Sequence, residues 1–195
     1  MDMIASWIGN IPDFAVPFAL AALGLIVIER SGVLALGAEG LMLVGALAGI
    51  GASLMTGGAT VWALILAMCA AGVVSLLFAL MVLVMRINQV IAGLALVFFC
   101  QGLTGLLGTL LDWTNKPVAG LQSLSLWPFS ELPVVGKLFV QNPLVFVTPL
   151  IFVVVVLVLN RSVLGLRLRA VGENPQAADA AGIPVLGYRC AAIVA

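Results

Sequence analysis

The chain has 195 residues, of which 64% are hydrophobic and 8% are charged, and its formal net charge at pH 7 is zero. Because soluble domains carry about 25% charged residues, this composition excludes a soluble globular protein and places most of the surface in lipid. The balanced charge gives no basis for nucleic-acid binding, and the absence of histidine removes the commonest metal ligand and general base, so neither a metal site nor a cofactor is predicted.

Four apolar tracts come first, and they are candidates for membrane-spanning helices, which need about 20 mostly apolar residues each. The tracts cover residues 14–28, 31–56, 60–85 and 90–111. The first tract is short, and the residues before it or a tilt extend it. Because no Lys or Arg precedes this tract, it lacks the charged start of a cleaved signal peptide, and we expect it to be retained.

The second half of the chain has one further complete tract between two polar stretches. The polar stretches cover 112–142 and 160–189, the tract covers 143–159, and Ala191–Ala195 has the composition of the start of another tract. We therefore predict an all-α fold, a polytopic transmembrane helical bundle with about five complete spans and the start of a sixth. The whole range 1–195 is expected to form a single transmembrane domain.

The basic residues divide unequally between the two sides of such a bundle. One side holds Arg30, Arg86, Arg161, Arg167, Arg169 and Arg189, and the other holds Lys116 and Lys137. Because Lys and Arg concentrate in cytoplasmic loops, we predict that the arginine-bearing side is cytoplasmic. The N-terminus and the loop 112–142 are then extracytoplasmic, and 160–189 is a cytoplasmic loop.

Small and aromatic residues predict local features of these tracts. Glycines three or four residues apart favour close helix packing, and they are Gly45, Gly49, Gly102, Gly105 and Gly108. Pro149 is expected to kink the fifth span. Trp113 and Trp127 fit a segment that lies at the membrane interface or covers a gate.

The stretch RAVGENPQAADAAGIPVLGYR, residues 169–189, predicts a short helix between two apolar tracts. Asn174 is a favourable N-cap, and Pro175 suits the first helical position. Gly182 fits the left-handed position after a helix, and Pro184 prevents continuation. The helix then has about two turns, or roughly 10 Å. Its alanines make it slim, so it is either a rigid element that docks on a cytoplasmic partner or a connector on the membrane surface.

The few polar side chains within the apolar tracts are functional candidates, because placing them in lipid is costly. Glu39 lies about 13 Å beyond Arg30 if the residues between are helical, and nearby glycines favour a broken helix there. Glu39 either lines a translocation pathway or caps the broken helix. Asn88 and Gln89 either cap the fourth span or line the pathway. Gln101 either bonds another helix or contacts a polar solute.

No constellation of catalytic residues is visible. A membrane enzyme needs a nucleophile with a base, or a metal cluster, and no GxxxxGK[ST] phosphate-binding motif occurs in the sequence. The chain is therefore not expected to be an enzyme, and if it takes part in ATP-driven transport, the ATPase is another chain. No convincing internal repeat supports a complete inverted-repeat transporter.

Three stretches resemble one protein family in sequence, order and spacing. They are ERSGVLALGAEGLMLVGA (29–46), INQVIAGLAL (87–96) and GLRLRAVGENPQAADAAGI (165–183), with QNPL (141–144) at the start of the fifth span. The chain resembles the permease subunits of bacterial ABC importers, in the simple-sugar and nucleoside branch that is related to branched-chain amino acid permeases. Two departures are Ala35, where the family often has Asn, and the several spans by which the family continues beyond Ala195. We therefore expect an N-terminal fragment.

This resemblance implies a permease in the bacterial inner membrane that forms the translocation pathway for nucleosides or simple sugars. The implied partners are ABC ATPase subunits, a second permease subunit in a homo- or heterodimer, an extracytoplasmic solute-binding protein and the lipid bilayer. The short cytoplasmic helix would be the coupling helix that docks on the ATPase. The implied docking residues are Glu173, Asn174, Pro175, Ala177, Ala178, Asp179, Ala181, Gly182 and Ile183.

Two alternatives stay open at the level of sequence. A branched-chain amino acid importer permease would use the same machinery for another solute, because in this family the binding protein carries much of the specificity. An ATPase-independent channel or secondary transporter would need no partner ATPase, but it does not explain the capped cytoplasmic helix.

Overall fold

The computed structural model describes residues 2–113, 116–117, 120, 124–125 and 140–194. The elements, in chain order, are α1 (Asp2–Arg30), α2 (Ala38–Met55), α3 (Thr60–Ala79), the π-helix η1 (Leu80–Val84), α4 (Gln89–Leu110), β1 (Leu124–Ser125), β2 (Val140–Gln141), α5 (Pro143–Arg161), α6 (Val163–Glu173), α7 (Pro175–Ala180) and α8 (Val185–Val194). The predicted all-α class is confirmed, and the two-residue strands form one short antiparallel pair.

Five of the described helices are long and apolar enough to cross a membrane, which confirms the predicted number of complete spans. Two boundaries differ from the expectation. The first helix begins at Asp2, because Pro12 and Pro17 are accommodated within it. The last helix begins at Val185 and not at Ala191, because the polar residues in its first half find hydrogen-bond partners at the end of the bundle.

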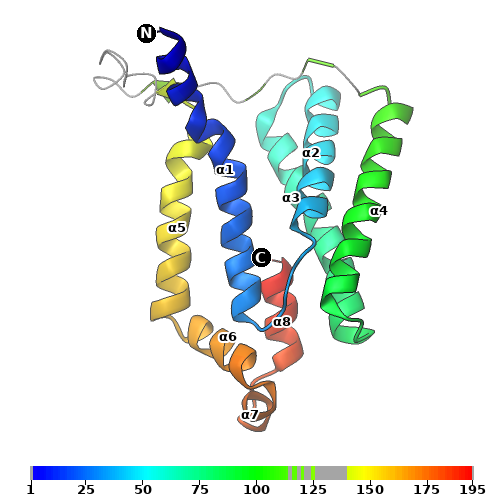
Figure 1. Cartoon of the computed structure of the whole chain (residues 1–195), viewed down its shortest axis with the longest axis vertical. Coiled ribbons are helices and arrows are strands. Elements are labelled where there is room, and N and C mark those ends of the chain that lie inside the picture. The colour runs from blue at the N-terminus through cyan, green and yellow to red at the C-terminus, as the bar shows by residue number, and fades with distance from the viewer. Residues whose placement is uncertain (1, 114–115, 118–119, 121–123, 126–139, 195) are drawn as a thin grey trace.

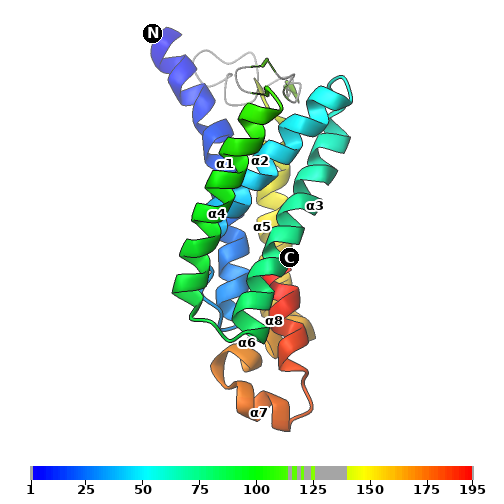
Figure 2. The ribbon, with the colours of Figure 1, turned by 90° about the vertical axis from the view of Figure 1, so that its right-hand side faces the viewer.

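The spans fall into two groups (Figure 1). α1 and α5 lie side by side, α2, α3 and α4 form the second group, and α8 rises between the two. α6 and α7 lie beyond one end of the spans, and α7 is the element farthest from the N-terminus (Figures 1 and 2). This end, at which α1 and α5 end and α4 begins, is called the α7 end below.

The positive charge of the described chain is concentrated at the α7 end. Arg30 and Arg161 are the last residues of α1 and α5, Arg86 precedes α4, and the other three of the six arginines belong to α6 and α8. Lys116 follows α4 at the opposite end, where it forms an ion pair of 3.7 Å with Asp112. The arginines that the sequence assigns to one side of the bundle therefore also lie at one end of it in the structure.

The buried core surrounds the non-helical segment between α1 and α2. Val33 and Ala35 of this segment belong to one hydrophobic cluster with residues from α1, α2, α3, η1, α4 and α8. Leu96 and Cys100, both from α4, are almost completely buried in the same cluster. The spans therefore pack around an irregular segment and not only against one another.

Glycines bring α2 and α3 close together. A Cβ built on Gly45 or Gly49 would lie 3.6–3.7 Å from a carbonyl oxygen of α3. Close packing is thus confirmed for this pair. Beside Gly102 and Gly105 no other described residue comes within 4 Å, so close packing at these two glycines stays a prediction. α4 turns its other face to the core, so these two glycines lie outside it.

The start of α5 is tied to α1 at the end opposite the α7 end. The side-chain amide of Gln141 donates a hydrogen bond to the Gly9 carbonyl, and that of Asn142 donates to Asp13 at 3.1 Å. α5 continues as a helix through Pro149, and a kink there stays a prediction. These bonds fix the first and fifth spans relative to each other.

Trp113 covers the same end of α2. A Cβ built on Gly51 would lie 3.1 Å from Cζ2 of the indole ring and closer still to two other ring atoms. The ring also lines a shallow depression between α2 and α3. Trp113 therefore packs directly on the backbone of α2. Trp127 and Lys137 lie outside the described residues.

Replacing Gly51 by alanine is expected to displace the Trp113 ring, because the new methyl group needs the space that the ring occupies. Overpacking of this kind costs about 1–3 kcal/mol. We expect a lower Tm and stronger acrylamide quenching of tryptophan fluorescence for the full-length protein in detergent. The control is Gly72→Ala, which adds a methyl group where no heavy atom lies within 4 Å. Equal Tm values for the two variants would contradict this packing.

Candidate functional site

The second span is interrupted before it becomes helical. Residues 31–37 have no regular structure, and α2 begins only at Ala38. Every second residue from Ser31 to Gly37 is buried and those between are exposed, which is the alternation of an extended chain. Gly32 starts this segment with a φ of +78°, a conformation that glycine adopts readily. The predicted break is confirmed, and because these residues are not helical, the helical rise from Arg30 does not give the depth of Glu39.

The side chain of Gln89 holds the extended segment from α4. Its Oε1 accepts a hydrogen bond from the Leu34 N–H at 2.7 Å. The neighbouring Asn88 accepts from the Val90 N–H at 2.9 Å and so caps α4. An unpaired backbone N–H in lipid costs several kcal/mol, so Gln89 supplies the partner that a continuous helix would have supplied. A pathway role for these two carboxamides stays a prediction.

The backbones of α4 and the second span meet at glycines on both sides. A Cβ built on Gly93 would lie 3.1 Å from Cβ of Leu36. A Cβ built on Gly40 would lie 3.2 Å from Cα of Val97 and 3.3 Å from Sγ of Cys100. These spaces are too small for a side chain, so α4 fixes the position at which α2 begins.

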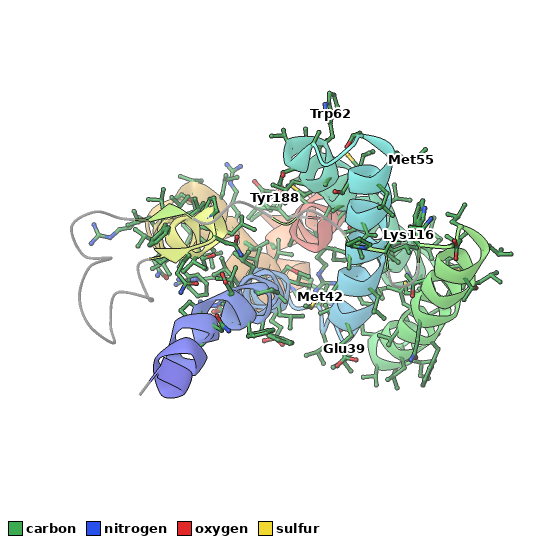
Figure 3. The ribbon with its side chains drawn as sticks, turned by 90° about the horizontal axis from the view of Figure 1, so that it is seen from above. Glu39, Met42, Met55, Trp62, Lys116 and Tyr188 are labelled. Carbon is green, nitrogen blue, oxygen red and sulfur yellow. The ribbon has the colours of Figure 1, made fainter. Side chains whose placement is uncertain are left out.

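Glu39 lies beside this contact and faces away from the core. It belongs to the first turn of α2 and is exposed, on the outer side of α2 in Figure 3. Its carboxylate forms no hydrogen bond or ion pair with any residue that the structure describes. A negative charge in the first turn is favourable because of the helix dipole. Glu39 is thus an exposed charge at the start of a broken span, and it forms no side-chain cap.

Gln101 lies at the same level of the bundle on α4. It follows Cys100, which contacts Gly40, and Glu39 precedes Gly40. Gln101 is exposed, and its carboxamide has no hydrogen-bond partner among the described residues. The structure therefore places Glu39 and Gln101, two polar residues from different spans, on either side of one helix contact.

An apolar cavity of about 260 Å³ lies between α1, α2, α3 and α8. Among the described side chains that line it, Ser75 alone carries a polar group, and its hydroxyl already donates to the Gly72 carbonyl at 2.8 Å. A polar solute would find almost no hydrogen-bond partners in this cavity. It is therefore a less suitable place for such a solute than the exposed side chains of Glu39 and Gln101.

The short helix predicted from the sequence is α7, and its caps are confirmed. The Oδ1 of Asn174 accepts from the Ala177 N–H at 3.0 Å, and Pro175 is the first helical residue. Gly182 has a φ of +79° just beyond the helix. With six residues, α7 is somewhat shorter than the expected two turns.

The implied docking residues do not all face outward. Ala178 is only 4% exposed, so it holds α7 to its neighbours. Ala177, Asp179 and Ala181 are exposed and form the outward surface of α7. Glu173 is exposed as well, but it is the last residue of the preceding helix and not part of α7.

That preceding helix, α6, was not predicted from the sequence. Its buried residues Gly165, Leu168 and Val171 are three apart, and this helical spacing is the signal that identifies it. Its arginines bind neighbouring helices: Arg167 donates to the Tyr188 hydroxyl on α8 at 3.0 Å, and Arg169 donates to Asn160 on α5. α6 is therefore fixed on two sides.

The described chain thus has five apolar helices, a broken second span and a capped short helix at its arginine-rich end. Residues 8–195 match the family model described as branched-chain amino acid transport system / permease component. The chain belongs to this family. The resemblance inferred from the sequence is thereby confirmed, and the five apolar helices agree with a multi-pass membrane permease.

The curated relatives of this permease chain carry names from sugar and nucleoside transport. The chain is 34% identical to the putative glucose ABC transporter permease of Haloferax volcanii, over 100% of the chain and 60% of the relative. It is 33% identical to the guanosine ABC transporter permease of Bacillus subtilis, over 90% and 58%, and 30% identical to the nucleoside ABC transporter permease of Lactococcus lactis, over 96% and 62%. The chain thus spans about three fifths of the length of these relatives. No solved structure matches it.

Replacing Asn174 by alanine is expected to fray α7, because the Ala177 N–H loses its acceptor. Loss of an N-cap costs about 1 kcal/mol, which corresponds to roughly fivefold faster amide exchange through local opening. Hydrogen exchange of the full-length protein should show this change within 175–181. The control is Asn174→Asp, which keeps an acceptor oxygen and should exchange like the wild type. Equal exchange in both variants would show that this cap does not hold α7.

Proposed function

We propose that the full-length protein is the membrane-spanning permease subunit of an ATP-driven ABC importer for nucleosides or simple sugars. The observation that carries the proposal is α7, a capped helix that stands at the arginine-rich end of a bundle whose relatives are named ABC transporter permeases. A partner ATPase hydrolyses the ATP, and this chain contributes to the pathway. The printed names of the relatives, which mention glucose, guanosine and nucleosides, support this solute class.

The orientation follows from the distribution of arginines. With all six at the α7 end, the positive-inside rule supports a cytoplasmic α7 end. The N-terminus and the loop 112–142 then face the extracytoplasmic side of a bacterial inner membrane. The segment 160–189, which comprises α6, α7 and the start of α8, forms the cytoplasmic part.

The partners follow from the two ends of the bundle. The exposed face of α7 docks on an ABC ATPase subunit, with Ala177 and Ala181 one turn apart on a slim helix. The opposite end is available to an extracytoplasmic solute-binding protein. A second permease subunit, identical or related, completes the membrane part.

The pathway lies beside Glu39 and Gln101. Nucleosides and sugars carry hydroxyl groups that need hydrogen-bond partners in the membrane. Both side chains are exposed and unpaired among the described residues, and both flank the same α2–α4 contact. The rest of the full-length chain or the second permease subunit closes the pathway over them. Asn88 and Gln89 lie nearer the cytoplasmic entrance, at the start of α4.

A branched-chain amino acid is the second candidate solute, because the family description names it. The same uptake experiment distinguishes the candidates. Cells that express the full-length operon products are given labelled adenosine, ribose or leucine, with an active or an inactivated partner ATPase. ATPase-dependent uptake of adenosine or ribose supports the proposal, and ATPase-dependent uptake of leucine alone supports the second candidate. Uptake that does not depend on the ATPase would contradict both candidate importers.

The docking role of α7 predicts that Ala177→Arg weakens ATPase association in the full-length protein. A long charged side chain on the slim exposed face would separate the two surfaces, at a cost of about 1–2 kcal/mol or roughly 5- to 30-fold in Kd. The measurement is the amount of ATPase that co-purifies with the permease. Ala177→Ser keeps the face small and is the control. Full co-purification with the arginine variant would argue against docking through α7.

The pathway role of Glu39 predicts that Glu39→Ala reduces uptake while assembly with the ATPase stays intact. A hydrogen bond to a charged group is worth about 1.5–3 kcal/mol, so we expect a loss of roughly tenfold or more in the uptake rate. Glu39→Asp keeps the carboxylate and should retain part of the activity. If Glu39→Ala instead abolishes expression or assembly, the residue is structural and the pathway role is refuted.

A further inference from the structure

The C-terminal end of α6 touches the turn between α1 and α2 through the backbone of two glycines. A Cβ built on Gly172 would lie 3.1 Å from the Gly32 nitrogen and closer still to the Arg30 carbonyl oxygen. A Cβ built on Gly32 would in turn lie 3.0 Å from the Gly172 carbonyl oxygen. Two glycines thus bring two distant parts of the chain into backbone contact, and neither position has room for a side chain.

A second helix holds the same turn from another side. Arg189 of α8 donates a hydrogen bond from Nε to the Ser31 carbonyl oxygen at 3.2 Å. One terminal nitrogen of its guanidinium lies 3.3 Å from a Cβ built on Gly32. Ser31 itself is fully buried, and its hydroxyl donates to the Ile28 carbonyl at 2.6 Å. The turn is therefore held rigidly against both α6 and α8.

These two helices are the ones that flank α7. Asn174 is both the C-cap of α6 and the N-cap of α7. On the other side, three residues after the Ala181 C-cap lead into α8. A displacement of α7 therefore moves the ends of α6 and α8, and both of these contact the turn that starts the second span.

The other end of the extended segment is fixed to α4. Gln89 accepts from the Leu34 N–H, and Leu36 rests on Gly93. Ser31 and Gly32 donate their N–H groups to carbonyls at the end of α1, at 2.9 and 3.0 Å. The Leu34 N–H and the Ser31 carbonyl are bonded by side chains of α4 and α8. The segment follows those elements when they move, and it ends at α2, whose first turn carries Glu39.

We propose that residues 30–37 form a strap that carries motion of α7 to the start of α2, with Gly172, Arg189 and Gln89 as its positioning residues. This inference rests on the proposed importer function. Gly172 and Arg189 attach the strap to the helices that flank the ATPase contact, and Gln89 attaches it to α4. Gly172 and Arg189 need not touch the solute or the ATPase, and Gln89, which is also a pathway candidate, acts on the strap through its bond to the Leu34 N–H.

The test uses the full-length permease with its ATPase and solute-binding protein in proteoliposomes. Gly172→Ala forces α6 away from the Arg30 carbonyl without changing the exposed face of α7. We expect normal co-purification of the ATPase, and at least about fivefold less solute transported per ATP hydrolysed, as for a lost coupling energy of ordinary size. The control is Gly187→Ala on α8, which meets no heavy atom within 4 Å and should transport like the wild type.

A pair of variants at the other end of the strap gives an independent measurement. Gln89→Met keeps the length of the side chain but removes the acceptor of the Leu34 N–H, and Gln89→Glu keeps an acceptor oxygen. The strap predicts a lower ratio of transport to ATP hydrolysis for Gln89→Met and recovery of the ratio in Gln89→Glu. If Gly172→Ala fails to assemble, this pair decides the question.

Three outcomes separate the inference from the function on which it rests. Wild-type transport with an unchanged ratio in both Gly172→Ala and Gln89→Met would overturn the strap and leave the importer function intact. A reduced ratio with normal ATPase association supports the strap. Wild-type uptake without any dependence on the ATPase would overturn the importer function, and the strap with it.

Discussion

The backbone of a membrane protein must find its hydrogen-bond partners within the protein, because lipid supplies none. Helices meet this constraint by themselves. In residues 31–37, Ser31 and Gly32 still donate to carbonyls of α1, but the extended part that follows forms no helical bonds of its own. The surrounding structure makes this segment possible: Gln89 pairs the Leu34 N–H, Arg189 pairs the Ser31 carbonyl, and Val33 and Ala35 enter the core. The position of α2, and of the charge that it carries, depends on these contacts.

Glycine makes those contacts close enough to hold. Lipid does not drive helices together as water does, so association depends on packing and small residues are favoured at crossings. Gly93 and Gly40 bring α4 against the second span, and Gly172 brings α6 against the turn before it. A Cβ built on Gly102 or Gly105 of α4 would meet no such atom within 4 Å in the described chain, whereas one built on Gly108 would lie 4.0 Å from Leu47, and the Gly108 carbonyl accepts from the Trp113 N–H. Membership in a repeated pattern therefore does not decide whether a glycine packs; the face on which it lies does.

The arrangement separates two kinds of chemistry along the bundle. The α7 end collects the arginines and a capped helix with an exposed alanine face, which suits contact with a soluble partner. The level of the α2–α4 contact carries the exposed Glu39 and Gln101, which suit a polar solute. The extended segment connects the two levels. In the proposed importer, the ATPase docks at the α7 end and the solute passes at the level of the α2–α4 contact. The extended segment between these two levels is therefore where ATP hydrolysis and solute transport are coupled.

The sequence by itself determined the class, the five spans and the caps of α7, because these depend on local patterns: long apolar runs, Asn174 before Pro175, and Gly182 after the alanines. It also identified Glu39 beside a break, since glycines cluster there. It missed α6, because the helical pattern of apolar residues there is short and is interrupted by charged residues. Only the tertiary structure showed that Ala178 is buried, that Gln89 bonds Leu34 and that Gly172 touches the turn after α1. The last two facts depend on contacts between residues 55 or more positions apart, and such contacts are set by the packing of whole helices and not by any local pattern.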